Sequence, residues 1–340
     1  MSPPPPSFRL PPLLKDWPWP RVQHPALEEA AIACISWLDN SALDASDKEK
    51  VRRGSELGST LAALAYPTLD KKSFIVACHL LSVLFLIDDF TDPKKASDAQ
   101  NVVNTIMDVF EYPLKERSAA DPFVAETTRQ FWIRALDISP LWQQTLFIAH
   151  FREYLNAVVI EASDREIDHL RDFDDYIHMR RSTGALRPAF WVIECAEGLP
   201  EHVVKHESIV TLATCAADLI IFGNDILSYN REQALGSLHN TVSIAVHKQC
   251  LGIQEAIDWT VARHDDVARK FQATIDEVPS WGPDIDNHVR AYIDTLGYWV
   301  RANWEWSLGS SRYFEKEEWR LIEKTGIVEL LPKVLEADKI

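Results

Sequence analysis

Glycine is scarce in this sequence: the 340 residues contain only 11 glycines, and the 19 prolines are concentrated near the N-terminus. Few chain-breaking residues therefore interrupt the long periodic stretches that follow. A fold built from many short strands needs many turns, and this composition does not supply them. The sequence therefore favours helices, and its 46% hydrophobic content is ample for a large core.

Positive charge is also in short supply. The chain has 35 Lys and Arg residues against 51 Asp and Glu residues, which gives a formal net charge of -16. An acidic surface repels both nucleic acid and anionic membranes, so we expect neither as a partner. The composition leaves room for a local basic pocket that binds an anionic small molecule.

Paired cysteine motifs, a leader sequence and long apolar runs are lacking too. The first residues, MSPPPPSFRLPPLL, do not form a basic region followed by an apolar one. No stretch approaches the ~18 to 20 uninterrupted apolar residues of a membrane span. We expect a cytosolic protein with reduced, buried thiols, because no CxxC spacing occurs among the five cysteines, Cys34, Cys78, Cys195, Cys215 and Cys250.

What the sequence does contain is helix after helix. Residues 1–25 are rich in proline and tryptophan, and we expect them to form an extended arm that packs on the body. Residues 26–340 show no linker and no repeat, which indicates one all-α domain. The periodicity predicts helices at 26–39, 47–65, 71–91, 95–110, 119–135, 140–162, 172–194, 202–206, 208–233, 239–247, 252–277, 284–308 and 315–324.

One predicted helix ends in a cluster of carboxylates. Phe85, Asp88 and Asp92 share one face, with apolar groups deep and acidic groups at the C-terminal end before a proline. Asp at a helix C-terminus opposes the macrodipole, so helix stability does not explain these residues. Carboxylate oxygens are ligands for hard cations such as Mg²⁺. A solvated helix end, compensated by two following lysines, is the alternative interpretation.

A second apolar helix carries a second array of oxygen ligands. Asn224, Ser228 and Glu232 are spaced four residues apart and lie within ~80° of one helical face. The preceding stretch CAADLIIFG is too apolar for an exposed helix. Two buried-type helices that each end in oxygen ligands together predict a metal site.

These two segments resemble the metal-binding motifs of class I terpene synthases. DDFTD (88–92) has the form DDxxD, and NDILSYNRE (224–232) has the form NDxxSxx(K/R)E. Their separation and the N-terminal WPWPR resemble the fungal sesquiterpene synthases, particularly those of basidiomycetes, over essentially the whole chain. The resemblance implies a single-domain α-helical barrel at 26–340, three Mg²⁺ ions and farnesyl diphosphate as substrate. It favours Asp88, then Asp92, as ligands.

The resemblance also implies a set of groups that bind the diphosphate. Arg180 would sense the diphosphate, Thr183 would act as linker, and Gly184 would mark a helix break whose carbonyl faces the substrate. Arg181 is the alternative to Arg180. The remaining diphosphate contacts would be Arg231, Arg312 and Tyr313. Arginine suits this task because its guanidinium binds phosphate oxygens bidentately.

Aromatic residues predict the apolar side of the pocket. We expect Phe85 and Trp306 to line it, because each precedes a matched polar motif on its own helix. An aromatic face attracts a passing carbocation and excludes water. For Trp299 a place in the core and a place in the pocket are equally compatible with the sequence.

The sequence therefore predicts a Mg²⁺-dependent enzyme that ionises farnesyl diphosphate and cyclises the resulting cation. Three alternatives stay open: water capture that gives an acyclic alcohol of the nerolidol or linalool type, prenyl-chain elongation, and a non-catalytic helical binding protein. Elongation would require a second DDxxD motif, which the Asn/Ser/Glu array replaces. The product and the oligomeric state are not readable from the sequence.

Overall fold

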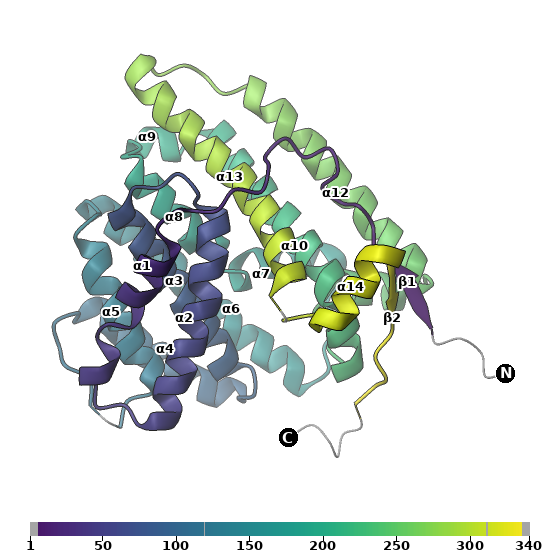
Figure 1. The fold of residues 1–340 in the computed structure, drawn as a ribbon, viewed down its shortest axis with the longest axis horizontal. Coiled ribbons are helices and arrows are strands. Elements are labelled where there is room, and N and C mark those ends of the chain that lie inside the picture. The colour runs from purple at the N-terminus through teal and green to yellow at the C-terminus, as the bar shows by residue number, and fades with distance from the viewer. Residues whose placement is uncertain (1–5, 119, 311, 335–340) are drawn as a thin grey trace.

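The computed structural model describes residues 6–118, 120–310 and 312–334, and these residues are predominantly helical (Figure 1). Its helices are α1 (Leu27–Ile35), the 3-10 helix η1 (Leu38–Asn40), α2 (Ala45–Ala65), α3 (Lys71–Thr91), α4 (Ala96–Glu111), α5 (Phe123–Leu136), α6 (Leu141–Glu166), α7 (Phe173–Thr183), α8 (Leu186–Ala196), α9 (Glu201–Val204), α10 (Glu207–Leu235), α11 (Thr241–Lys248), α12 (Ile253–Asp276), α13 (Pro283–Gly309) and α14 (Lys316–Thr325). The prediction of an all-α fold is confirmed.

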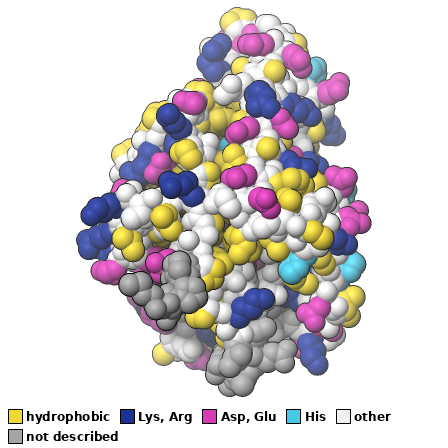
Figure 2. Space-filling model, turned by 90° about the vertical axis from the view of Figure 1, so that its right-hand side faces the viewer, with side chains coloured by type: hydrophobic (Ala, Val, Ile, Leu, Met, Phe, Trp, Pro, Cys, Tyr) yellow, Lys and Arg dark blue, Asp and Glu magenta, His cyan; other side chains and the backbone are white. Residues whose placement is uncertain are grey.

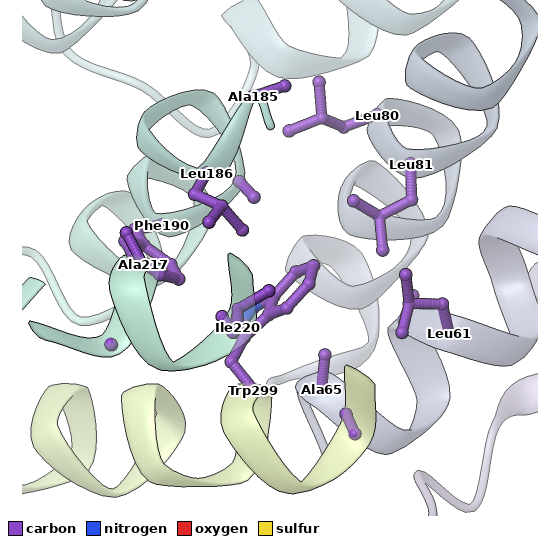
Figure 3. Close-up of a cluster of buried hydrophobic side chains, with 14 of the residues drawn as sticks. Leu61, Ala65, Leu80, Leu81, Ala185, Leu186, Phe190, Ala217, Ile220 and Trp299 are labelled. Atoms are coloured by element: carbon purple, nitrogen blue, oxygen red, sulfur yellow. The ribbon is translucent and has the colours of Figure 1, made fainter. Parts of the chain in front are cut away.

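Five helices surround one apolar centre. Helix α2 packs on α3 and α13, α13 packs on α10, and α8 touches α3, α10 and α13. Figure 3 shows their side chains converging, among them Leu61 from α2, Leu81 from α3, Phe190 from α8 and Trp299 from α13. The rings of Tyr66 and Phe190 meet the Trp299 ring edge-on. Trp299 lies within this cluster, so it belongs to the apolar core.

The scarce glycines allow α2 and α3 to approach closely. A Cβ atom placed on Gly58 would lie 2.3 Å from the backbone nitrogen of Ser82, and one placed on Gly54 would lie 2.6 Å from Cγ of Leu86. Asp70 caps the N-terminus of α3, and its carboxylate accepts hydrogen bonds from the backbone N–H groups of Lys72 and Ser73. The cap and the close packing fix where the acidic end of α3 lies.

Two details of the predicted secondary structure are wrong. The predicted helix 172–194 is divided into α7 and α8, because Ala185 adopts a left-handed conformation with φ of 51°. Short strands also occur where sustained alternation is absent: β1 (Ser7–Arg9) pairs antiparallel with β2 (Ile327–Glu329). Strands of three residues are too short to produce a periodic pattern in the sequence.

The residues before α1 are extended and contact the helices. Trp17 is buried and donates a hydrogen bond from Nε1 to the backbone oxygen of Gly297, and Arg301 donates to the carbonyls of Leu14, Trp17 and Trp19. Residues 1–5 of the predicted arm lie outside the described residues. The division of the chain into an arm at 1–25 and a domain at 26–340 stays a prediction.

Two helices, α3 and α10, are long and apolar enough to cross a membrane by length and composition alone. Their most apolar windows are 67% and 78% buried inside the fold, as expected for central helices of a helical domain. On the face shown in Figure 2, acidic and basic side chains are mixed with small hydrophobic areas.

Replacing Gly58 by alanine is expected to lower the free energy of unfolding by about 1–3 kcal/mol, because the new methyl group meets the rigid backbone of α3. Thermal denaturation followed by circular dichroism measures the effect. Gly309→Ala is the matched control, because no atom lies within 4 Å of the position that its new Cβ atom would take. Equal melting temperatures for both variants would contradict the close approach.

Candidate active site

The cavity and the predicted residues

A cavity of about 1000 Å³ opens where the ends of α3, α10 and α13 meet the walls formed by α2, α6 and α7. Most of the predicted site residues line it: Asp88, Asp92, Arg180, Thr183, Asn224, Arg231, Glu232, Trp306, Arg312 and Tyr313. Phe85, Gly184 and Ser228 are outside the lining, although each lies next to a lining residue in space or sequence. Residues that lie more than 200 positions apart in the sequence thus line the same cavity.

The acidic end of α3

The carboxylates of α3 crowd one wall of the cavity. Arg312 lies 3.1 Å from Asp88 and 3.9 Å from Asp89. Burial raises the pKa of Asp88, although Arg312 acts against the shift. Desolvation in the cavity also raises the pKa of Asp92 to about 7, with further contributions from Asp88 and from Glu161 on α6. Arg312 beside Asp88 and Arg165, 3.9 Å from Asp92, act against these shifts.

The oxygen ligands of α10

The second array lies on the wall formed by α10. The Asn224 side chain accepts a hydrogen bond from Arg180 (3.1 Å) and donates one to the Tyr313 hydroxyl (2.9 Å). Glu232 accepts a hydrogen bond of 2.9 Å from Asn240, and burial raises the pKa of Glu232 to about 7. Asn240 also lies 3.3 Å from the hydroxyl of Ser228, which is fully buried. Asn240 therefore holds two of the three predicted ligands in one orientation.

Fit to a divalent cation

The donor set suits a hard divalent cation. It consists of carboxylate, amide and hydroxyl oxygens, the chemistry that Mg²⁺ prefers, and desolvation together with neighbouring carboxylates raises the pKa of both Asp92 and Glu232. Within the described ranges, no three His, Cys, Asp or Glu side chains are already gathered around one point. The residues fit metal ions held between two walls and a bridging ligand rather than a closed protein cage.

The arginines

Neighbouring arginines of α7 have different surroundings. Arg181 makes two hydrogen bonds of 2.7 Å to the carboxylate of Asp218 and does not line the cavity. Arg180 lines the cavity, donates to Asn224 and lies 3.8 Å from Asp225. Arg181 is thus committed to a bidentate pair, whereas Arg180 presents its guanidinium to the site.

The segment after α13 connects both acidic walls. Arg312 reaches Asp88 on α3, the backbone oxygen of Arg312 accepts a hydrogen bond from Arg231 on α10, and Tyr313 bonds Asn224. The guanidinium of Arg312 also lies 5.1 Å from the centroid of the Phe85 ring. Residues 312 and 313 therefore link every wall that carries a predicted ligand.

The helix break and the aromatic wall

The helix is interrupted between α7 and α8, beside the cavity. Helix α7 ends at Thr183 with Gly184 as its C-cap, at the residue where the sequence predicts a helix break. Gly184 itself has φ of −68°, and the residue in the left-handed conformation is Ala185. A non-glycine residue in this conformation costs about 1 kcal/mol or more, which the surrounding buried residues must offset. Thr183 lines the cavity immediately before the break.

Aromatic rings form part of the apolar wall. The rings of Phe85 and Trp306 lie 5.2 Å apart at an interplanar angle of 31°. The indole N–H of Trp306 donates a hydrogen bond to the hydroxyl of Thr60 on α2. Leu57 and Leu64, on the same helix, also line the cavity. The cavity lining thus includes apolar groups from α2 and α13, beside the charged residues Arg53 and Glu56 of α2.

Residues that the sequence did not reveal

Sequence reasoning missed the buried polar groups behind the ligands. Asp225 accepts hydrogen bonds from the hydroxyl of Tyr176 (2.8 Å) and from the backbone and side chain of Thr241 (2.8 and 2.5 Å). Asp225 directly follows the predicted ligand Asn224, and this adjacency is the signal that could have found it. Asn240, eight residues after Glu232, has no comparable spacing rule, since it reaches the site only because α11 folds back.

Comparison with known proteins

A helical barrel with oxygen ligands on two walls of one cavity is the architecture of a class I terpene synthase. The family described as "Terpene synthase family 2, C-terminal metal binding" matches residues 79–270, and the chain belongs to it.

Two related proteins align with nearly the whole chain. Sesquiterpene synthase 14 of Postia placenta is 36% identical, with 98% of this chain and 95% of that protein covered. Delta(6)-protoilludene synthase STEHIDRAFT_64702 of Stereum hirsutum is 34% identical, with the same coverage. The crystal structure of germacradien-4-ol synthase from Streptomyces citricolor has the same fold, with a TM-score of 0.72, 22% identity and coverage of 85% and 96%. The protein is therefore an enzyme, a terpene synthase.

Asp225→Ala is expected to lower the free energy of unfolding by about 3 kcal/mol, because buried donors on Tyr176 and Thr241 lose their acceptor. Chemical denaturation measures the loss. The matched control is Asp266→Ala, which removes only a surface pair with Arg269 and should change stability by less than about 1 kcal/mol. Similar losses for the two variants would show that Asp225 does not organise the site.

Proposed function

We propose that this terpene synthase is a Mg²⁺-dependent sesquiterpene synthase that ionises farnesyl diphosphate, cyclises the cation and releases diphosphate. The observation that carries the proposal is the cavity itself, in which the proposed oxygen ligands of α3 and α10 and a set of arginines share one space with Trp306, Leu57 and Leu64. The names of its relatives, sesquiterpene synthase and protoilludene synthase, support a fifteen-carbon substrate.

The metal ions would be held on two sides. Asp88 and then Asp92 are the proposed ligands on α3, and Asn224, Ser228 and Glu232 are those on α10. We expect three Mg²⁺ ions, which supply Lewis-acid stabilisation of the leaving diphosphate when bound. The separation of the ligands over two walls suits ions that share a diphosphate between them.

Four side chains are proposed to bind the diphosphate oxygens: Arg180, Arg231, Arg312 and Tyr313. Two of them have uncharged hydrogen-bond partners, since Arg180 donates to a neutral amide and Arg231 to a backbone carbonyl. A diphosphate oxygen is a stronger acceptor than either partner, so Arg180 and Arg231 can exchange these partners for the substrate. Arg312 differs, because it forms an ion pair with Asp88.

The reaction begins when the bond between the allylic carbon and the diphosphate oxygen breaks, with both electrons leaving on the oxygen. The allylic cation that remains would lie against Phe85 and Trp306, whose aromatic faces attract positive charge. The proposed role of Thr183 and Gly184 is to end α7 beside the cleaved bond, where a backbone carbonyl faces the cation. Ring closure and loss of a proton complete the reaction.

The same ionisation could end differently. Capture of water by the cation would give an acyclic terpene alcohol, and the side chains that line the cavity do not by themselves separate that outcome from cyclisation. Chain elongation is disfavoured by the Asn/Ser/Glu array in place of a second DDxxD motif. We also propose that the enzyme works in a reducing compartment, the cytosol, where its free thiols stay reduced.

Incubation of the purified enzyme with farnesyl diphosphate and Mg²⁺ is expected to yield a cyclic hydrocarbon in the hexane extract, identified by gas chromatography–mass spectrometry. Chelation of the metal should abolish the product, because the ligand walls then cannot hold the diphosphate. An acyclic alcohol as sole product would replace cyclisation by water capture. No product from geranyl, farnesyl or geranylgeranyl diphosphate would contradict the proposal.

Arg180→Lys is expected to reduce turnover about 100-fold or more, since an ammonium group cannot replace the bidentate fork that faces the cavity. Arg181→Lys is the matched control on the next residue of the same helix. It should stay near wild type, because Arg181 is already paired with Asp218 outside the cavity. Steady-state kinetics with farnesyl diphosphate distinguishes the two, and the reverse order of effects would assign the diphosphate contact to Arg181.

A further inference from the structure

Two residues of the NDILSYNRE segment face away from the cavity. Tyr229 and Asn230 lie between the proposed ligand Ser228 and Arg231, and neither side chain lines the cavity. At ~100° per residue, Asn230 lies about 160° around the helix axis from Ser228. Both side chains are nevertheless buried. They must therefore contact something other than the substrate.

The side chains of Tyr229 and Asn230 contact segments near the two termini of the chain. Asn230 donates a hydrogen bond of 3.0 Å to the backbone oxygen of Glu329 and accepts one of 2.8 Å from the backbone N–H of Leu331. The ring of Tyr229 meets the buried ring of Phe8, in β1, with centroids 6.1 Å apart. We call β1, β2 and residues 330–334 the terminal clasp; in Figure 1 its two strands lie beside each other at one end of the molecule.

The Asn230 amide completes the hydrogen bonding of β2. Residues of a strand alternate their backbone groups between its two edges. One edge of β2 pairs with β1, and that pairing continues where Leu330 donates to the carbonyl of Pro6. Glu329 and Leu331 have their groups on the other edge, where Asn230 satisfies one acceptor and one donor at once. A neighbouring strand would make the same two bonds.

The clasp also holds the last turn of α10. The N–H of Val334 donates to the backbone oxygen of Ala234, one of the carbonyls that a helix end leaves without an intrahelical partner. Gln233 donates from its side chain to the carbonyl of Leu331. Glu232 and Arg231 lie in the same turn as these anchored residues. Both ends of the chain thus fix the part of α10 that carries a proposed metal ligand and a proposed diphosphate contact.

We propose that Asn230 is a positioning residue, which couples the terminal clasp to the orientation of Glu232 and Arg231 and so sets the affinity of the site for Mg²⁺ and diphosphate. The inference rests on the proposed function, since it assigns that site its support. It predicts that weakening a contact on the far side of α10 changes metal binding without touching any residue that lines the cavity.

The test compares two full-length variants that break one contact from opposite sides. Asn230→Ala removes both hydrogen bonds, and Leu331→Pro removes the N–H whose hydrogen bond Asn230 accepts, together with the leucine side chain, at a position 101 residues away. Each should raise the Mg²⁺ concentration for half-maximal activity about 5-fold, the factor that corresponds to loss of one hydrogen bond. Asn101→Ala, at an exposed site on α4, is the control. The double variant should be no worse than Asn230→Ala, because both changes remove the same interaction.

A second readout does not depend on turnover. Mg²⁺ with inorganic diphosphate should raise the melting temperature of the wild type, and this rise should shrink in both variants. A lower melting temperature without ligand, combined with an unchanged rise and unchanged half-saturation, would show that Asn230 only stabilises the fold and would overturn the inference. If Asn230→Ala does not fold, Leu331→Pro decides. A wild type that does not respond to Mg²⁺ and diphosphate would contradict the proposed function instead.

Discussion

Repulsion between carboxylates is the constraint around which the site is arranged. Asp88 and Asp92 on one wall and Glu232 on the other face a single cavity, and the pKa of each is raised because burial and neighbouring negative charge oppose its ionisation. Like charges in a shared cavity are tolerated only where cations are supplied. Arg312 supplies one by reaching Asp88, and Arg180 supplies another beside Asn224. Arg165 lies 3.9 Å from Asp92 and acts against the shift of its pKa. Bound cations would favour the ionised carboxylates further, which supports the proposed metal site although no closed cage of ligands is present among the described residues.

The apolar helices determine where this charge lies. Helices α3 and α10 are buried along most of their length, and the cavity is lined by the last turn of α3 and by residues of α10 from Asn224 onward. The apolar parts that make both helices resemble membrane spans are packed inside the fold and fix where these polar, partly exposed segments lie. Gly58 allows α2 to pack against the backbone of α3, so the acidic end cannot shift without moving a neighbouring helix.

Much of this arrangement could be predicted from the sequence, because ligands spaced four apart on an apolar helix leave a local pattern. Asn224, Ser228 and Glu232 are such a case: the structure brings Asn224 and Glu232 to the same cavity as Asp88, and Ser228 lies buried behind them, beside Asn240. The left-handed conformation of Ala185, next to the predicted break at Gly184, could not be predicted, since packing rather than propensity imposes it on an alanine. Asn240 and the pairing of β1 with β2 were missed because both depend on contacts between residues that no periodicity relates.

The two helix ends add a further electrostatic argument about the order of binding. The C-terminus of a helix carries a partial negative charge, and the ends of both α3 and α10 line the cavity. The protein as a whole is also acidic, with a net charge of -16. A diphosphate without metal would approach carboxylates, helix C-termini and an overall negative field, opposed only by a few arginines. In the proposed reaction bound Mg²⁺ would therefore favour substrate binding, because Asp88, Asn224 and Glu232 would hold its positive charge where the diphosphate is proposed to lie.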